Sequence, residues 1–118
     1  MTEPIIIEKR IISVLSQILS VPVMAELPKN PVFPCVVIEK TAGGYDTTIE
    51  DATIAVQSYG LTMQAAAELN EQVKWAMLDG LYEQNYITKV TLNTDYNFTD
   101  TTAERYRYQA VFDIKYYR

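Results

Sequence analysis

The chain has 118 residues, of which 48% are hydrophobic, 21% charged and 11% aromatic, and these values are typical of one globular domain spanning 1–118. With only 4 Gly and 5 Pro, collagen-like, low-complexity and disordered classes are excluded. Ten basic and 15 acidic residues give a formal charge of −5, which argues against a protein that clamps nucleic acid, because phosphate binding needs an excess of cations.

The N-terminal part of the chain predicts a helix followed by an extended segment. Apolar residues over 5–19 recur at the spacing of an amphipathic helix, and Thr2 or Glu3 can cap it. A short extended piece is expected over 23–27. Prolines at 28, 31 and 34 then keep the chain out of a helical conformation.

A β-hairpin is predicted after the last of these prolines. β-Branched residues over 35–41 indicate a strand, and the paired glycines within 42–46 indicate a loop, since glycine reaches positive φ without strain. Apolar and polar residues then alternate over 49–59, which is the pattern of an antiparallel partner strand.

A second helix and two further strands complete the predicted order. Thr62 is a suitable N-cap for a helix over 63–84, and strands are expected over 86–92 and 104–117, joined by a polar loop over 93–103. The predicted apolar face of this helix comprises Met63, Ala66, Ala67, Val73, Met77 and Leu81. The predicted core face of the last strand comprises Tyr106, Tyr108, Ala110, Phe112, Ile114 and Tyr116. The sequence therefore predicts an α+β fold with a mostly antiparallel sheet of four to five strands and two helices packed on one face.

The sequence contains no recognisable catalytic, metal or cofactor motif. His, the commonest general base, is missing, and no Cys/His cluster is present to hold zinc. The lone Cys35 has no disulfide partner, so a buried thiol in a reducing cytosol is its ordinary interpretation. The following carboxylates share no spacing typical of an acid/base pair and are expected on solvated faces: Glu39, Glu50, Asp51, Glu68 and Glu71.

Two segments resemble ligand loops but lack the residues that such loops require. Gly43 and Gly44 are not followed by Lys-Ser/Thr and a helix, as a phosphate-binding loop requires. Residues 95–100 begin like a calcium loop, yet Asp100 and Tyr106 stand where an EF-hand needs Gly and Glu. A hairpin connection held by hydrogen bonds from side chains to backbone is the better interpretation of 95–100.

The second helix carries the feature that favours an interaction surface. Trp75 and Tyr82 are seven residues apart and project with polar side chains such as Glu68, and exposed aromatic residues are enriched at protein interfaces. An alternative is that the first helix or the proline segment covers these two rings. On the apolar side, Asn70 and Lys74 indicate that the packing there is not uniformly sealed.

The tyrosine content favours the same interpretation. The chain has 9 Tyr, and a Tyr ring tolerates both water and a protein partner. Tyr45 and Tyr117 are the best candidates for exposure. Many of the others are expected in the core.

Four segments together resemble those of a known family. They are 21–26 (VPVMAE), 34–41 (PCVVIEKT), 52–59 (ATIAVQSY) and 95–100 (DYNFTD). In this order they resemble the small tail-completion, or tail-terminator (head-tail joining), proteins of long-tailed phages and prophages of Gram-positive bacteria. The likeness covers most of the chain, including the proline-led strand, the hairpin and the Ala-rich helix.

The resemblance implies a structural virion protein that resides in the host cytoplasm before assembly. Its copies would form a ring, typically a hexamer, that caps the head-proximal end of the tail tube and ends tail polymerisation. The implied partners are further copies of the chain, the major tail tube protein and the head connector or completion protein, with DNA only as passing cargo and no membrane. It implies no catalytic residue, cofactor or metal. The expected interface residues are Gly43, Gly44, Tyr45, Asp46, Trp75, Tyr82 and Phe98.

Three other functions stay open on the sequence. A head-completion or connector protein occupies the other side of the same joint and shares size and class. A small cytosolic protein-binding module would use the exposed aromatic residues to dock a host partner, and a carboxylate enzyme comes last.

The sequence predicts neither a signal peptide nor a membrane helix, because it has no basic start and no run of about 18 apolar residues.

Overall fold

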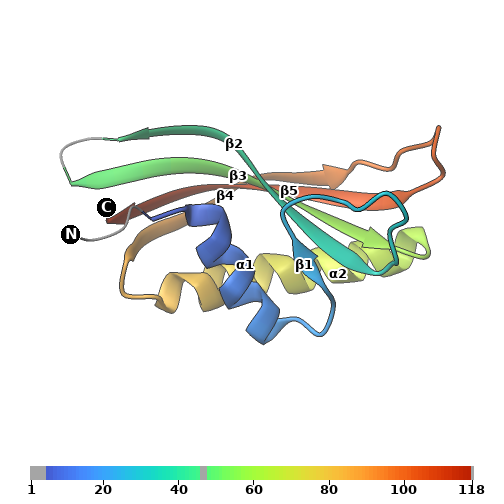
Figure 1. The fold of residues 1–118 in the computed structure, drawn as a ribbon, viewed down its shortest axis with the longest axis horizontal. Coiled ribbons are helices and arrows are strands. Elements are labelled where there is room, and N and C mark those ends of the chain that lie inside the picture. Colours follow the sequence, from blue (N-terminus) through green and yellow to red (C-terminus); the bar gives the residue numbers. More distant parts are fainter. Residues whose placement is uncertain (1–4, 46–47, 118) are drawn as a thin grey trace.

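A computed structural model describes residues 5–45 and 48–117 and has the predicted α+β architecture (Figure 1). The elements in chain order are α1 (Ile7–Ile18), β1 (Val23–Met24), β2 (Cys35–Tyr45), β3 (Ile49–Gly60), α2 (Met63–Trp75), a π-helical turn (Ala76–Gly80), a 3-10 turn (Leu81–Glu83), β4 (Ile87–Asn97) and β5 (Tyr106–Tyr117). The sheet has five strands in the order β1-β2-β3-β5-β4. Only β1 is parallel to its neighbour, and the other pairs are antiparallel.

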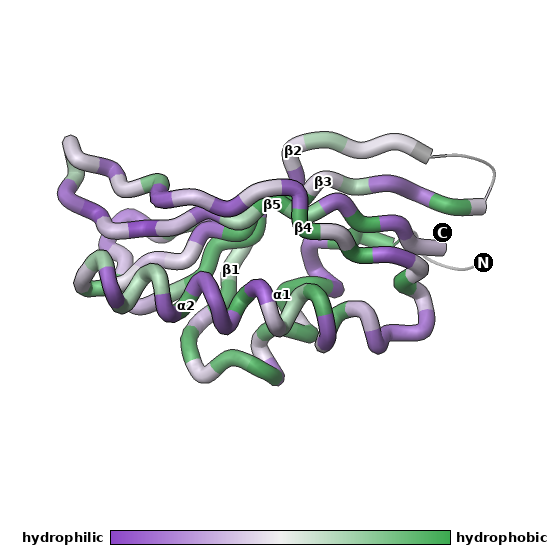
Figure 2. The backbone as a smooth tube through the Cα atoms, turned by 180° about the vertical axis from the view of Figure 1, so that it is seen from behind, coloured by the Kyte–Doolittle hydropathy of each residue, from purple (hydrophilic) through white to green (hydrophobic). Residues whose placement is uncertain are grey.

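Both helices lie on the same side of the sheet (Figures 1 and 2). The main core fills the space between the helices and the sheet. Figure 2 shows hydrophobic and hydrophilic residues alternating along the helices and the long strands. The buried sheet residues of this core are Val36, Ile38, Ala52, Ile54, Val56, Ile87, Ala110, Phe112, Ile114 and Tyr116. The helical layer contributes Ile7, Ile11, Leu15, Leu19, Leu69, Val73, Ala76, Met77 and Leu81. Each of the larger side chains contributes roughly 1.5–3 kcal/mol when fully buried.

A second, smaller cluster lies on the opposite face of the sheet. Cys35 and Tyr59 are buried there, and the ring of Phe33 stacks on that of Tyr59 with centroids 5.2 Å apart. The proline segment therefore folds over one end of the face that the helices leave open. The peptide bond between Phe33 and Pro34 is cis.

Both hairpins are longer than the sequence predicted. The loop expected over 42–46 was wrong for its first four residues, because β2 continues to Tyr45 and pairs Gly43 with Ala52 and Gly44 with Asp51. None of the described glycines has positive φ, so the glycines extend the strand instead of turning it. The strand expected over 86–92 likewise continues to Asn97, and β5 pairs with it throughout.

The aromatic face of β5 was predicted correctly only in its second half. Ala110, Phe112, Ile114 and Tyr116 are buried, but Tyr106 is 40% exposed and Tyr108 is half-buried. The first residues of β5 lie near the β4–β5 connection, at one end of the long axis of the molecule (Figure 1). The alternation in the sequence fixes which face a residue points to, but not how far the opposing layer extends.

The helices differ from the predictions mainly at their ends. The N-cap of α1 is Ile6, without a capping hydrogen bond from its side chain, so the helix starts later than predicted, and Thr2 and Glu3 lie outside the described residues. Thr62 caps α2 as predicted, its hydroxyl accepting a hydrogen bond from the Ala65 amide at 3.1 Å. The single helix expected over 63–84 is wrong beyond Trp75, where the π-helical and 3-10 turns follow. The extended piece expected over 23–27 is a strand at its first two residues only.

Candidate interaction surfaces

Trp75 lies beside a shallow groove between the two helices. The groove, of about 460 Å³, is lined by Ile18 and Leu19 from the end of α1 and by Glu71, Gln72 and Trp75 from α2. Trp75 is 60% exposed, so neither α1 nor the proline segment covers it. The prediction that the only Trp projects from the polar face of α2 is confirmed.

The π-helical turn determines how closely the two helices approach beside this groove. A Cβ added at Gly80 would collide with the Cδ1 atom of Ile18, so the end of α1 packs directly on the backbone of the turn. Tyr82 follows in the 3-10 turn and is 54% exposed. Because the helix is irregular between them, the seven-residue spacing of Trp75 and Tyr82 does not by itself place their rings on one stripe.

The other expected interface residues lie at opposite ends of the molecule, which measures 44 × 25 × 25 Å. Gly43 and Gly44 are exposed in the β2–β3 hairpin, whereas Phe98 follows β4 at the far end (Figure 1). The backbone of Tyr45 ends β2, while its side chain and all of Asp46 lie outside the described residues. The expected residues therefore form three separate surfaces and not one patch.

Phe98 belongs to a small aromatic cluster around Arg107. The Arg107 guanidinium lies 4.3 Å from the centroid of the Phe98 ring, and its Nε donates a hydrogen bond of 2.6 Å to the Phe98 carbonyl. Tyr96 meets the same ring edge-on at 5.6 Å. Although Phe98 is 37% exposed, these contacts hold its ring in place. No pattern in the sequence indicates Arg107, which lies nine residues away on the neighbouring strand.

The hairpin connection predicted over 95–100 is confirmed only from Phe98 onward, because residues 95–97 are the end of β4. The Asp100 carboxylate accepts hydrogen bonds from the amides of Thr102 and Ala103 at 3.1 Å, and the Asn97 side chain accepts one from the Thr99 amide at 3.0 Å. Such bonds satisfy the turning backbone locally. In the described part of the chain, no group of three Asp, Glu, Cys or His side chains is placed to hold a metal ion.

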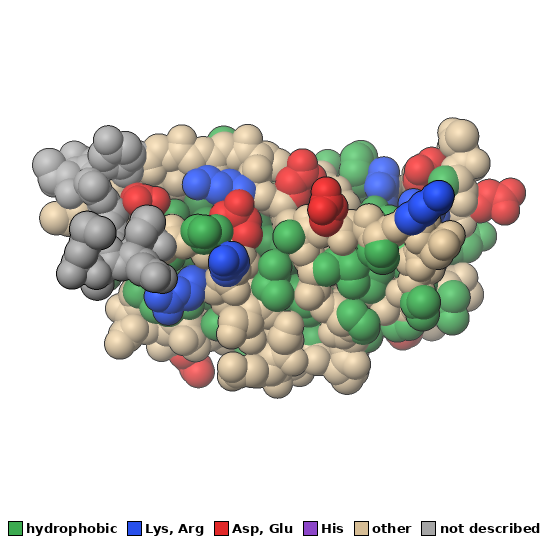
Figure 3. Space-filling model, in the orientation of Figure 1, with side chains coloured by type: hydrophobic (Ala, Val, Ile, Leu, Met, Phe, Trp, Pro, Cys, Tyr) green, Lys and Arg blue, Asp and Glu red, His purple; other side chains and the backbone are tan. Residues whose placement is uncertain are grey.

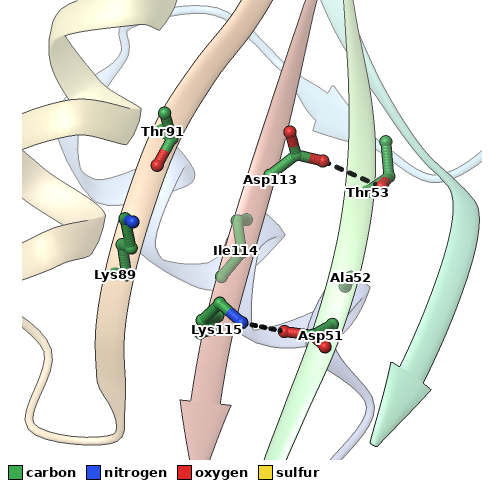
Figure 4. A pocket seen from close by; sticks show the side chains of 8 residues that line it. All are labelled: Asp51, Ala52, Thr53, Lys89, Thr91, Asp113, Ile114 and Lys115. Carbon is green, nitrogen blue, oxygen red and sulfur yellow. Dashed lines mark hydrogen bonds and ion pairs between the residues drawn. The ribbon is translucent and has the colours of Figure 1, made fainter.

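The open face of the sheet carries a polar network across three neighbouring strands (Figure 4). Asp113 on β5 accepts hydrogen bonds of 3.0 Å from Thr53 on β3 and from Asn93 on β4. Lys115 forms an ion pair of 3.0 Å with Asp51. The open face around Asp113 is therefore polar and carries both signs of charge. Figure 3 shows the molecule in the orientation of Figure 1, where acidic and basic side chains are likewise interspersed.

The carboxylates without a shared spacing contact different partners. Glu50 accepts a hydrogen bond of 2.7 Å from the Tyr116 hydroxyl, and burial together with this bond raises the pKa of that hydroxyl. Asp51 pairs with Lys115, and Glu68 accepts a hydrogen bond of 3.1 Å from Gln64. Glu39 is exposed on β2. These contacts serve the fold and give no sign of a shared acid/base site.

Lys74 and Asn70 lie on the inner side of α2, as predicted. Lys74 forms ion pairs with Glu71 at 2.9 Å and with Asp95 of β4 at 3.2 Å, and the hydrogen bond that its ammonium group donates to Glu71 raises the Lys74 pKa. Asn70 is buried, and its Oδ1 has no hydrogen-bond partner among the described residues. Lys74 therefore ties α2 to β4, and the expectation that this side of α2 is not sealed is wrong at Asn70, which is buried.

Cys35 is fully buried, and burial raises the pKa of its thiol. This is the environment of an inert structural cysteine. Among the helices of the described residues, none has the length and apolar character needed to cross a bilayer. No protein-family model matches the chain, and no curated protein matches it either.

Proposed function

We propose that the chain is a structural phage protein that caps the head-proximal end of the tail tube, ends its polymerisation and forms the joint to the head. The exposed aromatic side chains on separate surfaces carry this proposal. Trp75, Tyr82 and Phe98 are all partly exposed in the single chain. Trp and Tyr are among the side chains most enriched at interfaces, so their exposure indicates a surface that a partner covers. The resemblance of the sequence to tail-completion proteins supplies the identity of the partners.

The Trp75 groove supports the binding role physically. A Trp side chain can bury roughly 150–250 Å², and most of that area faces water in the single chain, where it is 60% exposed. Covering it with a partner would therefore be favourable, with the carboxylate and amide of Glu71 and Gln72 forming a polar rim. An apolar centre with a polar rim is the usual composition of a protein interface.

The proposal assigns three partners and one cargo. Copies of the chain form a ring, by the resemblance a hexamer, and the ring contacts the major tail tube protein on one side and a head connector or completion protein on the other. DNA only passes through, and the net charge of −5 disfavours its retention, because like charge weakens phosphate contact. The protein belongs to the virion and resides in the host cytoplasm before assembly.

Deletion of the gene in the phage or prophage that encodes it tests this function. We expect tail tubes of uncontrolled length and no infectious particles when lysates are viewed by electron microscopy. Expression of the wild-type chain from a plasmid should restore tail length, whereas Trp75→Ala should restore it poorly. Free tails of normal length beside unattached heads would instead assign the chain to head completion. Normal infectious particles would refute both roles.

A further inference from the structure

A chain of side-chain hydrogen bonds crosses the open face of the sheet near the β4–β5 connection. Nη1 of Arg107 donates to the Tyr59 hydroxyl at 3.0 Å, and that hydroxyl lies 3.3 Å from Oε1 of Gln57. Nε2 of Gln57 lies 2.9 Å from Oε1 of Gln109, and the Gln109 amide group contacts the Tyr96 hydroxyl. Strands β5, β3 and β4 thus contribute to one continuous network.

Arg107 sets the direction of every bond in this chain. A guanidinium group has only donors, so the Tyr59 oxygen must accept and the Tyr59 proton must point to Gln57. The carbonyl oxygen of Gln57 then faces Tyr59, and the Gln57 amide group donates to Gln109. In the same way the Gln109 amide group donates to the Tyr96 oxygen. The hydroxyl proton of Tyr96 is therefore the last donor in the chain.

Both ends of this chain lack an acceptor among the described residues. Arg107 uses Nε for the Phe98 carbonyl and Nη1 for Tyr59, while its Nη2 has no acceptor within residues 5–45 and 48–117. No carboxylate in the described part of the chain forms an ion pair with this guanidinium. The Tyr96 hydroxyl proton has no acceptor there either. Because aligned hydrogen bonds polarise one another, the uncompensated charge of Arg107 also strengthens Tyr96 as a donor.

The two ends of the chain converge on the Phe98 ring. The Arg107 guanidinium lies 4.3 Å from the centroid of this ring, and the Tyr96 ring meets it edge-on at 5.6 Å. Tyr59, which holds Nη1 of Arg107, is itself buried and stacked on Phe33. The guanidinium is therefore fixed before a ligand arrives, so that binding costs little side-chain entropy.

We propose that Arg107 binds a carboxylate group of a protein partner beside the Phe98 ring, with the Tyr96 hydroxyl as the second donor of the site. The inference rests on the proposed function, in which this end of the molecule contacts a partner. It names the chemistry that the partner presents there, an Asp or Glu side chain. A carboxylate has only acceptors and carries the single negative charge that offsets Arg107, and hydrogen bonds between two charged groups are the strong ones.

A nucleic-acid phosphate backbone fits this site less well than a protein carboxylate. Phosphate backbones are bound by several basic residues acting together, but the next basic side chain along this face of β5, Lys115, is already paired with Asp51. The chain also carries a formal charge of −5. Exposed aromatic rings beside an Arg are instead typical of the residues that dominate protein interfaces.

Titration with sodium acetate tests the site in the isolated protein, because acetate presents a carboxylate group alone. Sodium chloride at the same ionic strength is the control for screening. We expect the NMR signal of the Arg107 Nε–H to shift and saturate with acetate, whereas that of Arg10 should follow the chloride control. Arg10 also lies over an aromatic ring, 5.2 Å from the Tyr86 centroid, but its side chain donates no hydrogen bond within the described residues.

Two results of this titration would overturn the proposal. Equal shifts at Arg107 and Arg10, or a shift at Arg107 that does not saturate, would show that acetate acts only through ionic strength. Inorganic phosphate is titrated in the same way, and tighter binding of phosphate than of acetate at Arg107 would assign a phosphate ligand instead.

Tyr96→Phe tests the second donor, because it removes the hydroxyl and keeps the ring. We expect acetate to bind this variant roughly 2- to 10-fold more weakly than the wild type. Tyr117→Phe is the matched control, since it removes a hydroxyl from an exposed Tyr at the other end of β5, and it should bind acetate like the wild type. Unchanged affinity of Tyr96→Phe would overturn the assignment of Tyr96 to the site.

Charge reversal tests the partner in the phage whose gene is deleted. Arg107→Glu should fail to restore infectious particles, and replacement of an Asp or Glu of the contacted protein by Lys or Arg should restore them. Full infectivity with Arg107→Glu alone would overturn the proposal. Where Arg107→Glu does not fold, the acetate titration of the wild type decides. That titration does not depend on the phage, so failure of the site and failure of the tail function are separate results.

Discussion

Gly60→Ala is expected to destabilise the chain by displacing the start of α2. A Cβ at this position would lie 2.5 Å from the Ala66 amide nitrogen and 3.0 Å from the Ala65 carbonyl carbon. Favourable contacts between such atoms lie at about 3.5–4.0 Å, so the methyl group would be roughly 1 Å too close. The obstructing atoms are backbone, which cannot rotate away as a side chain can.

The expected loss of unfolding free energy follows from the hydrogen bonds that the displaced first turn of α2 makes. The Ala66 amide donates to the Thr62 carbonyl at 3.0 Å, and Thr62 caps the helix through the Ala65 amide. Overpacking costs about 1–3 kcal/mol, and loss of the cap adds roughly 1 kcal/mol. We therefore expect the free energy of unfolding to fall by about 2–4 kcal/mol, which a domain with roughly 5–15 kcal/mol of stability can tolerate.

Gly44→Ala is the matched control, because it is the same substitution in the same sheet. A Cβ at Gly44 would meet nothing within 4 Å, and its φ is not positive, so this variant should be more stable than the wild type by about 0.4–1 kcal/mol. Urea denaturation of dilute protein, followed by Trp75 fluorescence and circular dichroism, measures both variants. A Gly60→Ala variant within about 0.5 kcal/mol of the wild type would refute the steric argument.

Three further outcomes are expected. Trp75→Ala should reduce stability by less than about 2 kcal/mol, because most of the ring is already exposed, but should lower the assembled fraction in sedimentation velocity; loss of folding would contradict this. Ser58→Ala should raise stability by roughly 1 kcal/mol in urea denaturation, since the buried hydroxyl has no partner among the described residues. Lys74→Met should cost about 1 kcal/mol at neutral pH. The folded state raises the Lys74 pKa, so the contribution is complete below the ordinary pKa of 10.5 and is lost at higher pH; a cost independent of pH would contradict the ion pairs.

The parts of the fold that the sequence predicted correctly are those set by local periodicity. The apolar spacing over 5–19 predicts one face with Ile7, Ile11, Val14, Leu15, Ile18 and Leu19, and four of these are buried, while Val14 is half-buried and Ile18 is exposed. Thr62 was recognised as a cap because capping depends on residues within one turn. The alternation in the last strand identified Phe112 and Tyr116 as core residues.

The missed features depend on contacts between distant segments. Gly43 and Gly44 have little strand propensity of their own, and they are extended because β3 pairs with them on one side and with β5 on the other. Residues 93–97 are polar, so only their pairing with β5 makes them a strand. The contact of Ile18 with Gly80 in the π-helical turn joins the end of α1 to the segment after α2, and no periodicity in either helix could reveal it.

The exposure of Trp75 could be predicted, but its surroundings could not. Helical spacing placed the ring on the polar face of α2, whereas the groove also needs Ile18 and Leu19 from α1. The contact of Arg107 with Phe98 likewise joins two strands whose register the sequence leaves undetermined. Sequence patterns thus identified single side chains, and the tertiary structure determined which of them act together.

The separation of these surfaces agrees with the demands of the proposed role. A protein that ends a tube and joins it to a head must contact copies of itself laterally and two different partners axially. The long strands run along the 44 Å axis of the molecule (Figure 1), so the two hairpin ends lie at opposite ends of the molecule. One end presents the exposed Gly43 and Gly44, and the other presents the aromatic cluster around Phe98. Two ends of different chemistry can select two different partners.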